Sequence, residues 1–137
     1  MEKKAVKIGA VIILLTVICT GFWLMPVKPL RGCTPDEITK ISIEGKLGLE
    51  NITDPEIVRT IAENIDSCGA KRSGISFSRR GYACVIYCYK GDECISSFSL
   101  CGKETARDSF FFYKPLNGTY CTEYINNLPV PEPETKQ

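Results

Sequence analysis

Cysteine is the residue type in this chain with the most scope for chemistry, and eight cysteines occur among its 137 residues. Seven of them follow an apolar N-terminal run, and six of those seven lie between residues 68 and 121. Such a density predicts an oxidising compartment, in which the six pair as disulfide bridges in an order that the sequence leaves open. The six disulfide candidates are Cys68, Cys84, Cys88, Cys94, Cys101 and Cys121.

Cys33 is left over, and it stands in a proline-rich stretch close to the apolar run. As an odd, exposed thiol it could link two chains into a homodimer, or it could stay free. A redox role is the alternative, in which Cys33 or a labile pair among Cys84, Cys88 and Cys94 exchanges disulfides. Metal binding is disfavoured, because no spacing matches the tight cysteine pair of a zinc site and the chain has no histidine.

The other polar residues form no catalytic pattern. Without histidine, the serines of the segment CISSFSL have no base to activate them. The close acidic residues Asp54 and Glu56 stand at an expected helix start, where a carboxylate complements the helix dipole. We therefore expect a protein that is not an enzyme and has no cofactor. Its net charge of +1 gives no general attraction to nucleic acid.

A basic stretch and an aromatic run are the two remaining candidates for binding. The stretch could hold an anionic partner such as lipid headgroups, a cell-wall polymer or an acidic protein face. The alternative is a solvated loop between a helix and a strand. The aromatic run over 110–113 could be a partner-binding patch or a core strand with one exposed ring. The possible anion-binding residues are Lys71, Arg72, Arg79 and Arg80.

The N-terminal segment predicts a membrane helix. Residues Ile8 to Met25 carry no charge and nearly reach the length that crosses a bilayer. Lysines precede this run and Pro26 follows it. By the positive-inside rule the N-terminus stays in the cytoplasm and the rest of the chain crosses to the extracytoplasmic side. A cleaved signal peptide is one alternative, although bulky residues fill the end of the run. Lipidation at Cys19 is another, although no small residue precedes it.

Four regions follow from this pattern. Residues 1–25 form a cytoplasmic tail and transmembrane signal-anchor, and 26–37 form a Pro-rich stem. A cysteine-rich extracytoplasmic domain covers 38–128, and a disordered tail covers 129–137.

The clearest element of the domain is an amphipathic helix over about 54–68. Thr53 and Glu56 predict a capping box at its start, and Gly69 ends it. The residues expected to face a sheet are Ile57, Ile61 and Ile65.

Strands are predicted around this helix. Two alternating runs flank Gly91-Asp92 and predict a β-hairpin. With a two-residue turn, Cys84 and Cys88 share a face with Cys101, whereas a shift by one residue places Cys88 opposite Cys94. The other expected elements are strands at 38–44, 109–114 and 120–121 and a short helix at 122–128. The fold class is therefore α+β, with an antiparallel sheet of three to five strands and one main helix on a face.

This order of elements resembles small extracytoplasmic domains of unknown function on bacterial membrane-anchored proteins and lipoproteins. The resemblance spans about 38–128 and rests on Ile41 and Ile43, on the helix start ITDPEIVRTI, and on the closing GTYCTEYINNL. It implies an α+β fold and no catalytic residue.

The expected function is a non-enzymatic binding or interaction module on a single-pass anchor in the cell membrane. Its partner would be another protein or a component of the cell envelope. A thiol-disulfide protein at the cell surface and an inhibitor or immunity-type module are the alternatives.

Overall fold

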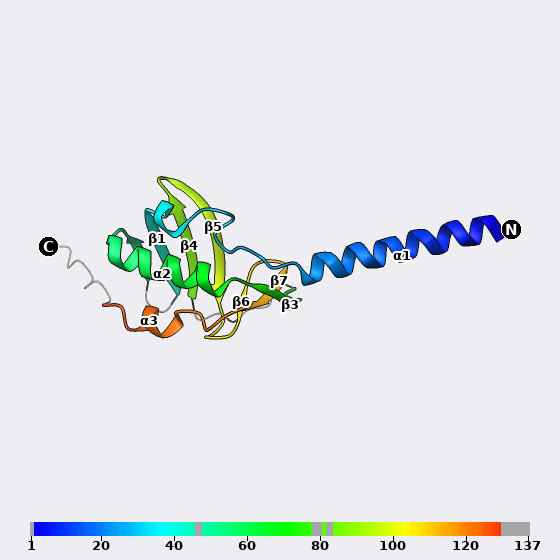
Figure 1. Cartoon of the computed structure of the whole chain (residues 1–137). Coiled ribbons are helices and arrows are strands. Elements are labelled where there is room, and N and C mark those ends of the chain that lie inside the picture. Colours follow the sequence, from blue (N-terminus) through cyan, green and yellow to red (C-terminus); the bar gives the residue numbers. More distant parts are fainter. Residues whose placement is uncertain (1, 46–47, 78–80, 82–83, 130–137) are drawn as a thin grey trace.

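The structure is a computed structural model that describes residues 2–45, 48–77, 81 and 84–129. A long N-terminal helix points away from an α+β domain (Figure 1). The described helical elements are α1 (Glu2–Leu24), a 3-10 turn η1 (Pro35–Glu37), α2 (Pro55–Cys68) and α3 (Thr122–Asn126). The described strands are β1 (Lys40–Gly45), β2 (Leu49–Ile52), β3 (Lys71–Ile75), β4 (Cys84–Lys90), β5 (Glu93–Leu100), β6 (Ala106–Arg107) and β7 (Phe111–Lys114).

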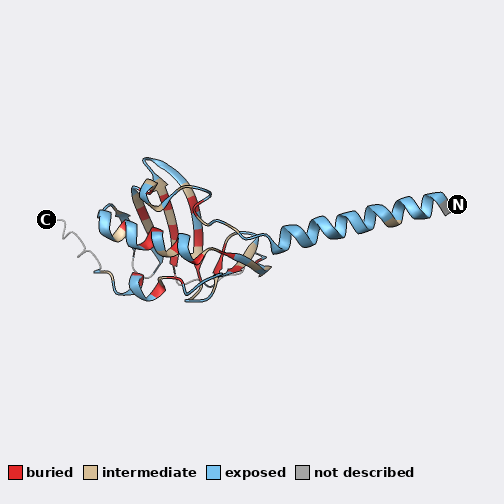
Figure 2. Cartoon of the chain, in the orientation of Figure 1, coloured by how far each residue is buried: buried red, intermediate tan, exposed pale blue. Residues whose placement is uncertain are grey.

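Helix α1 exposes its apolar side chains along its whole length (Figure 2). Its stretch Lys3–Leu24 is, among the described residues, the one helix that is long and apolar enough to cross a membrane. Membrane anchors and signal sequences share this length and composition. The predicted apolar helix is therefore confirmed, and no part of its most hydrophobic 18-residue stretch is buried against the domain.

Within the described residues, seven strands form one antiparallel sheet in the order β2-β1-β4-β5-β6-β7-β3. The α+β class is confirmed, but the expectation of three to five strands is wrong. The additional strands are β2, β3 and β6, which are short or polar and lack the alternating apolar pattern of a half-buried strand. The predicted strand at 120–121 is absent, and Cys121 instead precedes the first turn of α3.

The predicted helix over 54–68 is confirmed as α2, and its cap corrects the sequence analysis. Asp54, not Thr53, is the N-cap, because its Oδ1 accepts the backbone N–H groups of Glu56 and Ile57 at 2.9 and 3.2 Å. At the other end Gly69 has a φ of +57°, which glycine adopts without strain.

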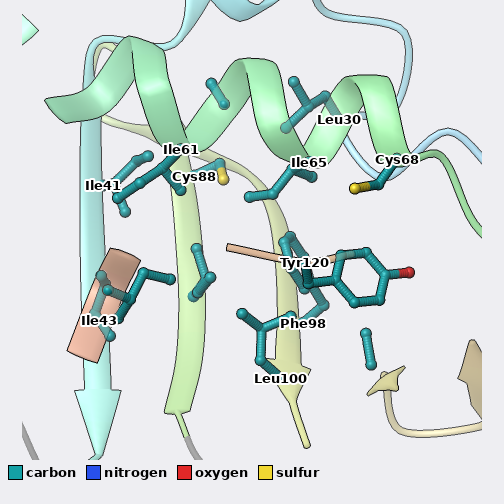
Figure 3. Packing of buried hydrophobic residues seen from close by; sticks show 14 of the residues in the cluster. Leu30, Ile41, Ile43, Ile61, Ile65, Cys68, Cys88, Phe98, Leu100 and Tyr120 are labelled. Atoms are coloured by element: carbon teal, nitrogen blue, oxygen red, sulfur yellow. The ribbon is translucent and has the colours of Figure 1, made fainter. Parts of the chain in front are cut away.

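The core lies between α2 and the inner face of the sheet (Figure 3). Ile61 and Ile65 point from α2 toward the strands and are fully buried, whereas Ile57 is only half-buried at the edge of the core. Leu30, from the segment predicted as a stem, is also fully buried and belongs to the same core cluster. The stem is thus part of the packed domain rather than a free spacer.

Candidate functional site

The junction between α1 and the domain is built around Arg72 of β3. Its Nη1 donates to the carbonyl oxygens of Phe22 at 2.7 Å and Met25 at 3.3 Å. The last carbonyls of a helix have no partner within the helix, and they carry the negative end of its dipole. The guanidinium therefore satisfies two such groups with a favourable charge.

Aromatic rings complete this junction. The Arg72 guanidinium lies 3.9 Å from the ring centroid of Phe22 and 5.4 Å from that of Phe111. The Phe111 centroid is 6.1 Å from both the Phe22 and Trp23 rings. These distances suit cation–π and edge-on aromatic contacts, so the last turn of α1 is held against β3 and β7.

The stem is fixed to the sheet next to this junction. Val27 and Ala70 exchange two backbone hydrogen bonds, with N–O distances of 2.7 and 3.1 Å. The Ser96 hydroxyl donates to the carbonyl of Pro29. The segment from the end of α1 to Leu30 therefore follows a defined path over the domain.

A cavity of about 130 Å³ lies between the stem and the sheet. Three aromatic side chains contribute to its wall, and two exposed cations from the stem also line it. Among the lining residues are Lys28, Arg31, Phe98, Asp108, Tyr113 and Tyr120. This cleft combines apolar walls with a few polar groups, as ligand sites do.

Asp108 organises one wall of the cleft. Its Oδ2 accepts the hydroxyl of Tyr113 at 2.6 Å, and its Oδ1 accepts the backbone N–H groups of Phe110 and Phe111, both at 2.7 Å. Burial, followed by the hydrogen bond to Asp108, raises the pKa of Tyr113 above its ordinary value. Tyr113 is therefore a neutral donor at physiological pH, and both oxygens of Asp108 are engaged.

All eight cysteines lie among the described residues and are free thiols in this structure, which thus contains none of the predicted bridges. Cys84 and Cys88 are buried on the inner face of β4, and Cys88 lies beneath α2 in Figure 3. Burial is the main cause that raises the pKa of Cys84 to about 11, and of Cys88 and Cys121 to about 12. Such thiols stay protonated at neutral pH and are poor nucleophiles.

The register of the hairpin decides between the two arrangements of its cysteines. The two-residue turn at Gly91-Asp92 is confirmed, but the register shifts between Cys88 and Tyr89. This irregularity places Cys84 opposite Leu100, which is buried, rather than on a shared face with Cys101. Cys84 and Cys88 do share the buried face of β4, and the exposed Cys94 stands opposite Tyr89 rather than opposite Cys88. The first arrangement therefore holds for these three residues, but Cys101 lies beyond the end of β5 and is not on the shared face.

Cys33 and the basic residues also differ from their predicted settings. Cys33 is half-buried against the core, and its N–H donates to the Leu30 carbonyl at 3.0 Å. Lys71 and Arg72 lie on β3 rather than in a loop, and Lys71 is exposed while Arg72 is committed to α1. The predicted residues Arg79 and Arg80 lie outside the described residues.

The sequence analysis missed the cleft and the role of Arg72. No local signal could indicate either, since both depend on segments far apart in the chain. In the part of the chain that the structure describes, no group of three or more cysteine and acidic side chains could hold a metal ion. No family model, curated protein or solved structure matches this chain.

Proposed function

We propose that this chain is a single-pass membrane protein that presents its α+β domain on the extracytoplasmic side as a binding module without catalytic activity. One observation carries the proposal: α1 exposes an apolar surface over its whole length, and only its end touches the domain. Such a large apolar surface is stable in a bilayer and unfavourable in water.

Charge supports the orientation of the domain. Lys3, Lys4 and Lys7 stand at the N-terminal end of α1, and the positive-inside rule places them in the cytoplasm. Lys28 and Arg31 follow the other end, but both belong to the wall of the cleft. Their positions thus have a second explanation, as polar groups of a binding site.

The cleft is the place at which we expect a ligand. Its aromatic walls and the cations Lys28 and Arg31 suit a small acidic group, such as a carboxylate side chain of a protein or an anionic substituent of an envelope polymer. A binding role is favoured over a catalytic one, because the carboxylate of Asp108 already accepts hydrogen bonds from three donors of the chain itself. A carboxylate that is committed to such structural hydrogen bonds is poorly placed to act as a general base.

Membrane fractionation of the full chain tests the anchor. We expect the protein to stay in the membrane after alkaline carbonate extraction, and added protease to digest the domain in intact spheroplasts. Recovery of a shortened soluble chain would identify α1 as a cleaved signal, and protection of the domain until lysis would reverse the orientation.

A matched pair of variants tests binding at the cleft. Ser97 lines the cleft and is exposed, so Ser97→Trp should fill it, whereas Ser67→Trp makes the same change on α2 away from the lining. A partner captured by the full chain in detergent should be lost with Ser97→Trp and retained with Ser67→Trp. Equal capture by both variants would rule out the cleft, and substrate turnover by the purified chain would rule out the non-catalytic role.

Cys33 could still join two chains, and its half-buried position makes this a separate question from binding. A dimer that appears on a non-reducing gel and disappears in Cys33→Ser would establish the link. A chain that migrates as a monomer under oxidising conditions would exclude it.

A further inference from the structure

The end of the domain nearest α1 carries apolar side chains that nothing in the described structure covers. Ile75, Phe77 and Phe110 are 52%, 74% and 71% exposed. The N–H of Ser76 donates to the carbonyl of Phe110 at 2.8 Å, which ties the two segments together. We call these three side chains the aromatic tip. Two phenyl rings held this far into water indicate a contact surface.

The aromatic tip is continuous with the end of α1. Phe111 follows Phe110 directly and pairs with Ile75 across the strands, and its ring lies 6.1 Å from those of Phe22 and Trp23. Figure 1 shows β3 and β7 beside the point where α1 meets the domain. The tip therefore lies at the level where the aromatic end of α1 would leave a bilayer.

We propose that the aromatic tip is a second membrane contact, in which Phe77 and Phe110 insert into the interfacial layer of the bilayer that α1 spans. This rests on the proposed anchor. Aromatic side chains favour the membrane–water interface, and Trp23 would already stand there. The segments 73–77 and 109–113 carry no charged residue, so their own side chains bring no ion into the interface.

The strained backbone conformation of Phe77 indicates that the exposure of its side chain has a functional reason. Its φ of +44° lies in the left-handed region, which is an outlier for a bulky residue. Such strain is kept where the surrounding structure or a function requires it. Phe77 is exposed and follows Ser76, whose N–H is bonded to the Phe110 carbonyl, and the N–H of Phe110 is itself held by Asp108 at 2.7 Å.

Tryptophan fluorescence of the reconstituted full chain tests this contact. The sequence contains a single tryptophan, so a Trp23→Phe background allows one new indole to be read at a time. Phe110→Trp and Phe77→Trp report on the tip. Tyr124→Trp, on α3 and 37% exposed, is the matched control away from α1. The probe is a liposome of zwitterionic and anionic phospholipids, with and without bromine on the acyl chains.

We expect the Phe110→Trp and Phe77→Trp indoles to emit at shorter wavelength than the control and to be quenched several-fold more strongly by the brominated lipids. If Trp23 of the unmodified chain is quenched while both tip indoles emit as in water, the tip contact is wrong and the anchor stands. If Trp23 is not quenched, the anchor itself fails. A blue shift without quenching would mean that a second copy or another protein covers the tip, which also overturns the proposal.

Discussion

Replacing Asp108 with asparagine tests whether its carboxylate stabilises the wall of the cleft through Tyr113. The carboxylate accepts three hydrogen bonds, of which two from backbone N–H groups go to Oδ1 and one from Tyr113 goes to Oδ2. In Asp108→Asn the amide oxygen can keep the backbone pair, but the amide nitrogen cannot accept the Tyr113 hydroxyl. A hydrogen bond to a charged group contributes about 1.5–3 kcal/mol, so we expect a loss of about 2 kcal/mol in the free energy of unfolding.

For a domain of this size the loss corresponds to a fall in Tm of about 10 °C. Thermal unfolding of the full chain in detergent, followed by near-UV circular dichroism, measures it. A double-mutant cycle with Tyr113→Phe isolates the pair, and we expect a coupling energy of about 1–2 kcal/mol. Asp108→Asn also removes the carboxylate that helps to raise the pKa of Tyr113, so the ultraviolet titration of Tyr113 should move to lower pH in this variant.

Additive effects of the two substitutions would refute this reasoning. A coupling energy below about 0.5 kcal/mol in the double-mutant cycle would mean that the Asp108–Tyr113 contact does not stabilise the wall of the cleft. An unchanged titration of Tyr113 in Asp108→Asn would mean the same, by an observable that does not depend on unfolding.

Three further outcomes follow from local geometry. Asp54→Ala should lower the free energy of unfolding by about 1 kcal/mol in a urea titration, whereas Thr53→Ala should change it by less than about 0.5 kcal/mol. A larger loss in Thr53→Ala than in Asp54→Ala would identify Thr53 as the cap instead. The hydrogen bond from Lys90 holds the pKa of Glu37 at about 2, below its ordinary 4.5. The stabilisation that the ionised Glu37 carboxylate gives to the fold is therefore complete above the ordinary pKa of 4.5 and is lost as the pH falls toward 2. The stability gap between the unmodified chain and Glu37→Gln should close over that window, and a constant gap would contradict it. In protein kept reduced, iodoacetamide should label the exposed Cys94 well before the buried thiols, because burial raises the pKa of thiols such as Cys88. Mass spectrometry measures the labelling of each cysteine, and equal rates at Cys94 and the buried thiols would contradict this burial.

The elements that the sequence predicted correctly are those with a local cause. Helix α2 follows from apolar residues at helical spacing, and the hairpin follows from Gly91-Asp92 between two alternating runs. The cap was misplaced because Thr53 and Asp54 are both good capping residues. Pro55 decides between them, since proline suits the first helical position and so makes the residue before it the N-cap.

The elements that were missed depend on distant partners. The sequence of β3 is polar and basic, which is typical of a loop. It forms a strand because it pairs with β7, which comes much later in the chain. Leu30 stands alone among polar and proline neighbours, so no periodicity marks it as a core residue. The role of Arg72 requires the end of α1 to be brought beside β3, and neither segment signals the other.

The junction also affects how a ligand at the cleft would meet the membrane. A free stem would let the domain sample many orientations, because short flexible segments cost little energy to bend. In this structure Arg72 holds the end of α1, Ala70 pairs with Val27, and Ser96 binds Pro29, so successive points of the stem are fixed to the sheet. The cleft, whose walls include the stem, therefore keeps one orientation relative to α1. If α1 spans a bilayer as we propose, a ligand in the cleft would be held at a set height above the membrane, which would favour partners fixed at the membrane surface over partners free in solution.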